Sequence, residues 1–480
     1  MAEGSVDEIV REVLRSITPS QEEVEDLLRR YHLVATRLRS CLRDYLPNSC
    51  IDISLQGSVA KGTNLRGESD LDVFVLFSRQ CVDPERYREL FKDFVERVRE
   101  CLSDIPSYME YAEHPYLVLL LDGVEVNIVP ALKPMIRGGA IEATTAVDRT
   151  PLHTEYVLKK LSPSKRREVL LLKSFLKGLG IYGAELKIKG FSGYLAELLV
   201  IHYGTFIDVL KGSLSWKPYR TCIDIEGFYG SEHRCLEVFR DSPLVVVDPV
   251  DPRRNAAAAV SLKSLSTFIV GAALFLREPS KDFFHCFKRR NAIDGSRAEN
   301  ALRTRGSRAV AIAIAVNPDV PPETLWGQVR RVERLAAKLL RERRYSVIYH
   351  DSWSDERSIA VVLLEVGALL SECYEVFRGP PATDVENALR FIDANRGRAV
   401  AGPWIDDNGV LHVVRRRKRC LDDELRELVS NTISQILKIG EVVYVGSSLR
   451  ALEKLIMERS GRLDEFREWL YTFIYRNIFT

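Results

Sequence analysis

The chain has 480 residues, of which 46% are hydrophobic and 28% are charged. This composition is close to that of folded globular proteins and excludes a disordered chain, while the length excludes a single small module and predicts about three domains. Lysine and arginine number 69 against 67 acidic residues, for a net charge of +2, so a nucleic-acid site would have to come from local clusters of basic residues.

The cysteines and the apolar segments indicate in which cellular compartment the protein is expected. The nine cysteines are scattered, odd in number and never in a C-x-x-C pair, which argues against a disulfide framework or a zinc site and favours a reducing cytoplasm. The acidic N-terminus lacks the features of a signal peptide. The longest apolar runs, 268–276 and 309–316, fall short of the roughly 18–20 residues that span a bilayer. We therefore expect a soluble, cytoplasmic protein without a membrane partner.

The N-terminal region predicts one long amphipathic helix. Thr18 has the residue type of an N-cap, Pro19 suits the first helical position, and Gln21 is placed to complete a capping box. We expect the helix to run from there to about residue 46.

The next hundred residues alternate between strand and helix patterns. The spacing of apolar residues predicts strands at 51–55 and 70–77, a helix at 83–102, and a hairpin of 116–121 with 124–129. The dipeptide Asp122-Gly123 between the last two strands is typical of a type I′ turn. These elements predict a compact α+β domain that ends near residue 150.

The rest of the chain is predicted to be a helical middle followed by a second mixed region. Long helices are expected at 166–180 and 192–212. Beyond residue 280, the patterns predict a strand at 309–316, a helix at 323–344, a strand at 358–366 and a hairpin around Asn408-Gly409. The fold class is therefore multi-domain α+β, with domains at 1–150, 151–280 and 281–480.

One stretch combines a glycine-serine pair with two aspartates. Because side chains alternate along a strand, Asp70 and Asp72 are expected on the same face of the second strand. Two neighbouring carboxylates repel each other, and this repulsion is relieved when both bind a hard divalent cation such as Mg²⁺. Gly57 lets backbone N–H groups approach a triphosphate, to which the Ser58 hydroxyl can donate. An Asp-x-Asp pair by itself is also compatible with a solvated strand end.

Further motifs follow in order and carry a resemblance to a known family. They are YAEHPY at 111–116, GVEVNIVP at 123–130, AVDRTPLH at 146–153, GIYGAE at 180–185, GFSGYL at 190–195 and VDPVDPRRNAA at 247–257. Together with residues 57–74 they resemble the archaeal-type, class I CCA-adding tRNA nucleotidyltransferases of the polymerase beta superfamily. The resemblance covers residues 57 to about 260, and beyond that only the general layout is similar.

The resemblance implies a fold and an activity. It implies a polymerase-beta-like nucleotidyltransferase head, a helical neck that completes the nucleotide pocket, and C-terminal body and tail domains that bind tRNA. The implied reaction is template-independent addition of C, C and A to the 3′ end of tRNA from CTP and ATP, with Mg²⁺ as cofactor and pyrophosphate as the leaving group. The oligomeric state is left open by the sequence, and a homodimer is one of the options.

The resemblance also assigns roles to the first motifs. Gly57, Ser58 and Lys61 are expected to hold the triphosphate, and Asp70 and Asp72 are expected to hold the metal ions. Lys61 stands where the family pattern usually has arginine. A lysine keeps the positive charge but loses the bidentate fork of a guanidinium group, so phosphate binding should survive the change.

Asn127 is the larger departure from the family pattern, which has a third carboxylate at this position. That carboxylate is expected to ligate the catalytic metal and to help deprotonate the attacking hydroxyl. The amide oxygen of Asn127 can still ligate a metal ion. The base role then falls to Glu125, which faces the same way two residues earlier on the strand, or to a metal-bound hydroxide.

Four residues match family positions around the incoming nucleotide. The resemblance places His153 and Tyr182 near the sugar, Lys173 on the phosphates, and Arg254 at the Watson–Crick edge of the base. Without the resemblance, these side chains would be a surface histidine, a boundary aromatic, a solvated lysine and half of a structural pair with Asp251.

Clusters of basic residues are the RNA-binding candidates. They are 288–290, Arg303 with Arg305 and Arg308, Arg341 with Arg343 and Arg344, and the run 415–419. Arg415, Arg416 and Arg417 are the best candidates, since RNA is gripped through its phosphates. Each cluster is also compatible with a solvated face. Glu113 and His114 match a family pair near the priming end, or they fix the entry of a strand.

Two rival functions remain open on the sequence alone. A related transferase, such as a poly(A) polymerase or an antibiotic-modifying adenylyltransferase, would differ in CTP use and in tRNA dependence. A catalytically impaired relative would bind tRNA without consuming nucleotide, and Asn127 keeps that alternative open. The retained pair of Asp70 and Asp72 argues against it, because a binding protein gains nothing from paired carboxylates beside RNA phosphates.

Overall fold

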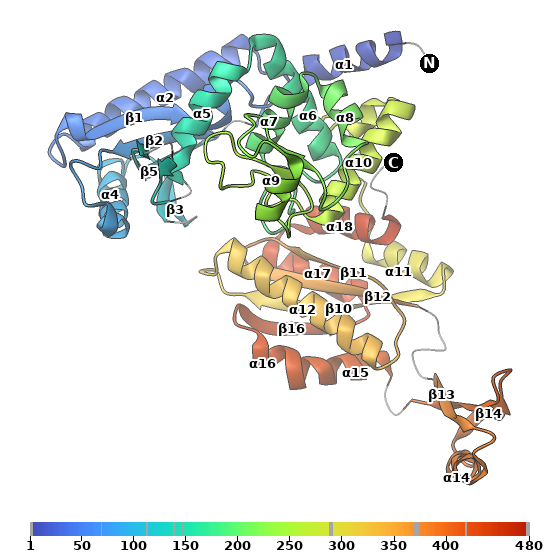
Figure 1. The fold of residues 1–480 in the computed structure, drawn as a ribbon. Helices are drawn as coiled ribbons and strands as arrows, with labels where there is room; N and C mark the ends of the chain where they lie inside the picture. Colours follow the sequence, from blue (N-terminus) through green and yellow to red (C-terminus); the bar gives the residue numbers. More distant parts are fainter. Residues whose placement is uncertain are drawn as a thin grey trace. The chain divides into compact units, whose positions relative to one another are not determined.

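The computed structural model of the chain forms two compact units, which are joined in sequence between residues 289 and 290. It describes residues 3–68, 70–111, 114–137, 140–145, 147–287, 291–367, 374–417 and 420–476. The first unit holds a five-stranded sheet and a group of helices, and the second holds two antiparallel sheets with their own helices (Figure 1).

The elements of the first unit follow the predicted order of an α+β region and then a helical region. The α+β region contains α1 (Glu3–Ile17), α2 (Gln21–Cys41), β1 (Ile51–Gln56), α3 (Gly57–Lys61), β2 (Leu71–Phe77), α4 (Tyr87–Cys101), β3 (Ser107–Tyr111), β4 (Pro115–Leu121), β5 (Val124–Leu132), β6 (Met135–Arg137) and β7 (Ala140–Glu142). The helical region contains α5 (Thr150–Lys160), α6 (Pro163–Gly178), α7 (Gly193–Tyr203), α8 (Phe206–Ser213), β8 (Cys222–Ile223), α9 (Glu232–Val238), β9 (Val245–Val246) and α10 (Leu262–Arg277).

The five-stranded sheet of the first unit has the strand order β1-β2-β5-β4-β3, in which only the β2–β5 pair is parallel. Helices α2 and α4 pack on one face, where Leu71 and Val73 of β2 are fully buried. Because side chains alternate along a strand, Asp72 and Phe74 lie on the opposite face. The predicted alternation of β2 is therefore confirmed, and it places Asp72 on the face opposite to α2 and α4.

The predicted hairpin is also confirmed. Strands β4 and β5 are joined by Asp122 and Gly123, whose φ angles are +49° and +82°. Two consecutive residues with positive φ are the mark of a type I′ turn, whose twist matches that of the strands it joins. The turn fixes the register of β5 and therefore the position of Asn127 along the sheet.

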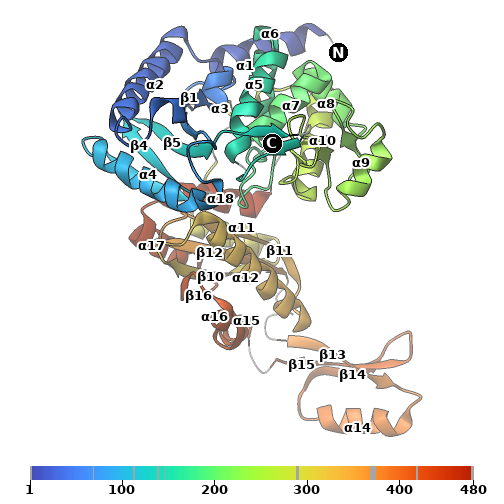
Figure 2. The same cartoon turned by 60° about the vertical axis from the view of Figure 1, so that its left-hand side comes forward.

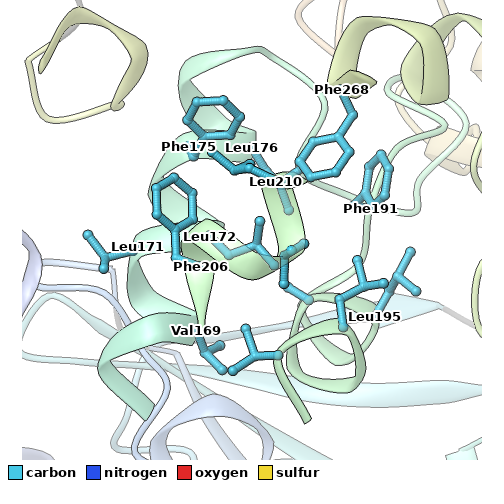
Figure 3. Close-up of a cluster of buried hydrophobic side chains, with 14 of the residues drawn as sticks. Val169, Leu171, Leu172, Phe175, Leu176, Phe191, Leu195, Phe206, Leu210 and Phe268 are labelled. Carbon is cyan, nitrogen blue, oxygen red and sulfur yellow. The ribbon is translucent and has the colours of Figure 1, made fainter. Parts of the chain in front are cut away.

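The helical region buries a cluster of aromatic and aliphatic side chains from α6, α7, α8 and α10 (Figure 3). Phe175 of α6 lies at its centre, with ring centroids 5.5 Å from Phe206 and 6.2 Å from Phe268. Burying one such ring contributes roughly 1.5–3 kcal/mol. The cluster makes α6 and α7 a rigid support for the polar side chains that they carry.

The start of the chain differs from the prediction. The residues before Thr18 form a separate helix, α1, which was not expected. The N-cap of α2 is Ser20, whose hydroxyl accepts from the N–H of Glu23 while the Glu23 carboxylate accepts from the N–H of Ser20. The capping box is thus shifted by two residues, and α2 ends at Cys41 instead of near residue 46. Thr18 with Gln21 and Ser20 with Glu23 both fit the capping-box pattern, and the structure uses the second pair.

The single helix predicted at 192–212 is wrong. Gly204, with φ of +101°, ends α7, and Thr205 caps α8 by accepting from the N–H of Asp208. The two helices are bent by 90°. Within the described residues, no single helix is long and apolar enough to cross a bilayer, and only this bent pair has the length and composition when the two helices are combined.

The elements of the second unit match the predicted order of strand, helix, strand and strand. They are α11 (Gly295–Thr304), β10 (Ser307–Val316), α12 (Pro322–Glu342), β11 (Val347–Ser354), β12 (Ile359–Gly367), β13 (Tyr374–Pro381), α14 (Val385–Asn395), β14 (Ala399–Ile405), β15 (Val410–Arg416), α15 (Leu421–Leu428), α16 (Ser434–Ile436), β16 (Gly440–Gly446), α17 (Leu449–Ser460) and α18 (Leu463–Tyr475). A π-helical turn at Val429–Ile433 joins α15 to α16.

The larger sheet of this unit has the order β11-β12-β10-β16 and is covered on both faces. Along β10, Val310, Ile312 and Ile314 pack with α12 and α15, while the alanines between them pack with α11, α17 and α18. The continuous apolar run at 309–316 is therefore a central strand buried on both sides, as predicted.

The smaller sheet has the order β13-β15-β14, with α14 lying against it (Figure 2). The rings of Phe377 in β13 and Phe391 in α14 stack at 6.2 Å. The hairpin predicted around Asn408-Gly409 is present, but its turn spans four residues and only Gly409 of the two has positive φ. The type of turn is therefore different from that of the β4–β5 hairpin.

The expectation of no disulfides is wrong. Three disulfides join described cysteines, namely Cys41–Cys101, Cys50–Cys81 and Cys222–Cys235, and Cys420 is also disulfide-bonded. The paired cysteines lie 13 to 60 residues apart in sequence, and the fold brings their Cα atoms to between 5.7 and 6.4 Å. Sequence spacing gives no sign of such pairs, because the helices and strands of the sheet bring them together.

We predict that these disulfides stabilise the first unit. Closing the 60-residue loop between Cys41 and Cys101 is expected to contribute about 4 kcal/mol through the entropy of the unfolded chain. The variant with Cys41→Ser and Cys101→Ser should lower the midpoint of thermal unfolding by at least about 5 °C. Cys286→Ser is the control, because Cys286 is exposed and unpaired. An equal midpoint for all three proteins, measured by calorimetry, would contradict the prediction.

Candidate active site

The glycine-serine pair lies where the first strand of the head turns into a short helix. β1 ends at Gln56, and Gly57 begins α3 with φ of +71°. A Cβ atom at position 57 would lie 1.9 Å from Oδ2 of Asp72, so the carboxylate occupies the space that only a glycine leaves free. Ser58 follows in the first turn of α3 and is half-buried. Gly57 thus brings this turn into direct contact with the second aspartate.

Asp70, Asp72 and Asn127 are brought together by the parallel pairing of β2 with β5. The register places Asp72 opposite Asn127, and the Asn127 amide Nδ2 donates to Asp72 Oδ1 at 3.1 Å. Asp70 is exposed immediately before β2 begins. The amide oxygen of Asn127 is then the atom of this residue that can bind a cation.

The electrostatics of this edge favour a cation. The pKa of the Asp72 carboxyl is raised by burial, against the opposing effects of the Asn127 amide and the Lys61 charge. The pKa of Asp70 is raised by loss of hydration and then by the charges of Glu125, Asp72 and Glu110. Carboxylate and amide oxygens are the ligands that hard divalent cations prefer, so the residues present fit such an ion.

The donor set at this edge contains only two carboxylates in the family positions. Across the described part of the chain, no three side chains of histidine, cysteine, aspartate or glutamate converge on one metal position. An asparagine at position 127 accounts for this, because it supplies an amide where the family pattern has an acid. Glu125 is exposed and accepts from the Tyr108 hydroxyl at 3.0 Å.

The two predicted phosphate-binding lysines meet on a carboxylate that the motifs did not indicate. Lys61 Nζ lies 2.6 Å from Oε2 of Glu197, and Lys173 Nζ lies 3.6 Å from Oε1 of the same residue. Lys173 also donates to the carbonyl oxygen of Thr63 at 2.8 Å. All of these groups are buried, and Glu197 is completely inaccessible to solvent. Lys173 is therefore an internal residue, which rules out the alternative of a solvated lysine.

Tyr182 lies between α6 and α7, and its hydroxyl approaches Gly193 at the start of α7, beside the same cluster. A Cβ atom at Gly193 would lie 2.9 Å from the Tyr182 hydroxyl and 3.5 Å from Lys173 Nζ, so both polar groups border this glycine. Lys177 lies over the Tyr182 ring, 5.2 Å from its centroid. The pKa of the Tyr182 phenol is raised by burial and by the charges of Glu197 and Glu185. The phenol is thus a neutral hydrogen-bonding group.

Asp248 forms the centre of a second polar cluster. Its carboxylate lies 2.9 Å from His153 Nε2, accepts from the Tyr194 hydroxyl at 3.0 Å, and accepts from Arg254 Nη1 at 2.8 Å. The rings of His153 and Tyr194 stack at 4.2 Å. Burial works to raise the pKa of Asp248, but the hydrogen bonds and the charge of His153 hold it below its usual value.

The structural alternative for Arg254, an ion pair with Asp251, is not what the structure shows. Asp251 instead binds Arg149 at 3.0 Å and Arg253 at 3.4 Å, while Arg254 binds Asp248. His153 and Arg254 therefore share one carboxylate, which was not foreseen from the sequence. Arg254 keeps a side chain that is 42% exposed, so it remains accessible although it is anchored.

The arginine run at the end of β15 is divided by its contacts. Arg415 lies over the Phe377 ring at 3.7 Å and binds Glu375 at 3.2 Å. Arg417 donates to the carbonyl oxygens of Arg343 and Arg344. Arg416 is exposed, and its side chain makes no ion pair or hydrogen bond with the described part of the chain. Only Arg416 is thus presented freely to a ligand, while the other two hold the smaller sheet and its surroundings.

The other basic clusters are partly used by the fold. Arg305 binds the buried Glu365 at 2.9 Å, Arg308 binds Asp422 at 2.8 Å, and Arg343 contacts Glu424. The cluster at 288–290 and the end of the run at 418–419 lie outside the described residues, as does Glu113. His114 is buried, with its ring 4.7 Å from that of Phe91.

Glu197 and Asp248 are the functional candidates that the sequence reasoning missed. A signal for Glu197 was present, because it is the single carboxylate in the otherwise apolar helix Gly193–Tyr203. An acid on a buried helix needs a cationic partner, which should have directed attention to the lysines. Asp248 lies in a quoted motif, but nothing in the sequence distinguishes it from Asp251.

Three family models match successive segments of the chain. A nucleotidyltransferase domain model matches residues 36–150, a model of the second domain of tRNA nucleotidyltransferase matches 167–285, and a model of the C-terminal domain of CCA-adding enzyme matches 305–443. A cytoplasmic RNA terminal U-transferase of known structure aligns with 59% of this chain and 99% of that chain, at 15% identity and a TM-score of 0.44.

Curated relatives match nearly the whole length. The CCA-adding enzyme of Pyrobaculum islandicum is 37% identical over 88% of this chain and 93% of its own length. That of Sulfurisphaera tokodaii is 37% identical over 88% of this chain and 92% of its own, and that of Methanothermobacter thermautotrophicus is 35% identical over 95% and 96%. On the strength of these matches, the chain belongs to the CCA-adding enzyme family of tRNA nucleotidyltransferases.

Proposed function

We propose that this protein is a tRNA nucleotidyltransferase that adds C, C and A to the 3′ end of tRNA from CTP and ATP without a nucleic-acid template. The observation that carries the proposal is the contact of Gly57 with Asp72 beside Asp70, in a chain that matches CCA-adding enzymes over nearly its whole length. The nucleotidyltransferase superfamily generally uses divalent metal ions, and we propose Mg²⁺ as the ion here, held by Asp70, Asp72 and the amide oxygen of Asn127.

The chain's own residues would bind and orient the two substrates. Phosphoryl transfer asks a protein mainly for positioning and for neutralisation of charge. A bound divalent ion supplies Lewis-acid charge neutralisation at the phosphate and an acidified hydroxyl. The α3 turn with Gly57 and Ser58 would hold the triphosphate through backbone N–H groups and a hydroxyl, and Lys61 and Lys173 would add positive charge.

The second cluster would hold the nucleoside. Asp248 fixes the His153 imidazole and the Arg254 guanidinium in one arrangement, which costs no reorganisation when a nucleotide binds. His153 with Tyr182 would contact the sugar, and the exposed fork of Arg254 would bind the polar edge of the base. In this proposal the side chain of Arg254 recognises the incoming base, which is the role that a template strand has in templated polymerases.

Glu125 is our candidate for the proton acceptor. In the parallel register Leu71 lies opposite Val126, which puts Asp70 level with Glu125. The charge of Glu125 is the foremost charge acting on the pKa of Asp70, so the two carboxylates are near neighbours. Since Asn127 cannot accept a proton, Glu125 would take the proton of the attacking hydroxyl.

The domain roles, the RNA-binding residues and the compartment follow from tRNA as the substrate. We propose that residues 1–150 are the catalytic head, 151–280 the neck, and 281–480 the body and tail that bind tRNA. Of Arg415, Arg416 and Arg417, we propose Arg416 as the residue that contacts RNA directly, while Arg415 and Arg417 hold the strand that carries it. The compartment would be the cytoplasm, where tRNA is processed. Disulfides do not contradict this, because disulfide-rich intracellular proteins are known. A homodimer is compatible with the proposal.

The decisive experiment mixes the protein with Mg²⁺, labelled CTP and ATP, and tRNA transcripts that end at the discriminator base, at C or at CC. Stepwise growth to CCA, without extension of finished tRNA, is expected. Addition of ATP to any RNA end would favour a poly(A) polymerase. Binding of tRNA without incorporation would point to the impaired relative.

Gly57→Ala is predicted to lower nucleotide incorporation at least about 100-fold, because the new methyl group would displace the Asp72 carboxylate by an ångström or more. Gly67→Ala is the matched control. Gly67 has nearly the same φ, +69° against +71°, but nothing lies within 4 Å of a Cβ there. The control should carry the same backbone strain and keep its activity. Equal losses in both variants would show that strain, and not contact with Asp72, is responsible.

Glu125→Gln is predicted to lower kcat for CMP addition about 100-fold, as expected for loss of a general base, with a smaller effect on the KM for CTP. Glu110→Gln is the control. The charge of Glu110 also raises the pKa of Asp70, but Glu110 lies on β3 and not on β5, the strand that pairs with β2. Unchanged turnover in Glu125→Gln, measured by single-turnover kinetics, would exclude Glu125 as the base.

Arg416→Ala is predicted to weaken tRNA binding and to reduce the slope of log K against log salt by about one, because one phosphate contact is lost. Arg390→Ala serves as the control, since Arg390 is also exposed but is paired with Glu386 on α14. Binding can be measured by filter retention at several salt concentrations. A slope identical to that of the unmodified protein would exclude Arg416 as a phosphate contact.

A further inference from the structure

Glu197 is a buried carboxylate that joins three parts of the first unit. It lies on α7, and it binds Lys61 from the end of α3 and Thr63 from the segment that follows. The Thr63 hydroxyl donates to Oε1 at 2.6 Å, and Lys61 Nζ lies 2.6 Å from Oε2. Lys173, on α6, completes the cluster. The carboxylate therefore has a partner on each oxygen and none in solvent.

The cluster contains more positive than negative charge. Two ammonium groups, with residues only 8% and 2% exposed, share one carboxylate at the centre. A buried charge is costly unless it is paired, so removing Glu197 would leave two like charges close together without a counter-ion. Lys61 has a second acidic neighbour in Asp72, because the charge of Lys61 works to lower the pKa of the Asp72 carboxyl. For Lys173, Glu197 is the one acidic residue whose charge raises the pKa of the ammonium group.

Lys173 is the member whose charge is most sensitive to this arrangement. Burial and the charge of Lys61 lower its pKa to about 8, while Glu197 works in the opposite direction. The groups around it are Glu197 from α7, Lys61 from α3, the hydroxyl and carbonyl of Thr63, and the neutral phenol of Tyr182. On its own helix, Lys177 is turned to Glu68 and the Tyr182 ring.

We propose that Glu197 is a positioning residue, which keeps the ammonium groups of Lys61 and Lys173 charged and fixed so that both act on the nucleotide triphosphate. This inference rests on the proposed function, which makes the two lysines phosphate-binding residues. Glu197 itself does not touch the substrate. It acts through the lysines, and it ties their positions to the turn after α3 that carries Thr63.

The test is CTP binding to the full chain in the presence of Mg²⁺ and without tRNA, measured by calorimetry between pH 6.5 and 8.5. Glu197→Gln keeps the size of the side chain but removes the charge, so the pKa of Lys173 should fall further. The affinity of this variant for CTP should be at least about tenfold below that of the unmodified protein at pH 8.5, and the difference should shrink at pH 6.5.

Glu197→Asp is the conservative variant. It retains the charge, so it is expected to keep the pH profile of the unmodified protein even if its affinity is lower. A merely structural role for Glu197 would instead give the same loss at every pH in Glu197→Gln. That result, or an unchanged affinity, would overturn the proposal.

Thr63→Val keeps the proposal testable if Glu197→Gln does not fold. It removes the hydroxyl that bridges Glu197 and Lys173 without changing any charge, so CTP binding should weaken with little change in its pH profile. Binding equal to that of the unmodified protein in this variant would overturn the proposal. If the unmodified protein itself fails to bind CTP, the proposed function fails first and the role of Glu197 is not the cause.

Discussion

The candidate active site depends on one buried ion cluster, in which the carboxylate of Glu197 holds the ammonium groups of Lys61 and Lys173. A buried charge is tolerated only when it is paired, so these side chains can occupy their positions only together. Lys61 comes from the head, directly after the strand that leads to Gly57, and the other two come from the helices behind it. The cluster therefore fixes the position of the α3 turn relative to α6 and α7.

The aromatic core beneath this cluster makes the arrangement rigid. Phe175 and Phe191 are fully buried close in sequence to Lys173 and Glu197, respectively, and they pack with Phe268 of α10. Close-packed interiors resist small displacements, so Lys173 on α6 and Glu197 on α7 are held in place beside this core. A site that works mainly by positioning charge needs this kind of support.

The two ends of the proposed nucleotide site follow the same physical rule. At one end a buried glutamate organises two lysines, and at the other a buried aspartate, Asp248, organises His153 and Arg254. In each case an acid without any contact with solvent supplies the charge that orders basic groups. Removing either acid would leave its partners both unpaired and free to move, which is why one residue governs several others.

Asn127 is compatible with the metal-binding edge for a related reason. An acid at this position would add a third negative charge beside Asp72, whose pKa is already raised by burial. The amide instead donates a hydrogen bond to Asp72 and so favours the charged form of that carboxylate. The chain therefore has one acid fewer at the centre of the site, while Glu125 and Glu110 provide negative charge at its margin.

Features that depend on neighbouring residues could be predicted from the sequence. The alternation of β2, the type I′ turn at Asp122-Gly123 and the buried run of β10 are local patterns, and all three are confirmed. The errors arose where two local solutions compete, as at Thr18 and Ser20, or where one glycine interrupts a periodic run, as at Gly204. Local patterns indicate which elements form, but they define element ends poorly.

Tertiary structure alone decided which distant side chains meet. Glu197 lies 136 residues from Lys61, Asp248 lies 95 residues from His153, and the disulfide partners Cys41 and Cys101 lie 60 residues apart. No spacing rule connects such positions, because their distance is set by how strands and helices pack. The same applies to residues 415–417, which are all arginines but differ in their contacts. The sequence thus supplied the chemical groups, and the packing of the fold decided which of them are paired, since buried charges must find partners wherever the chain brings them.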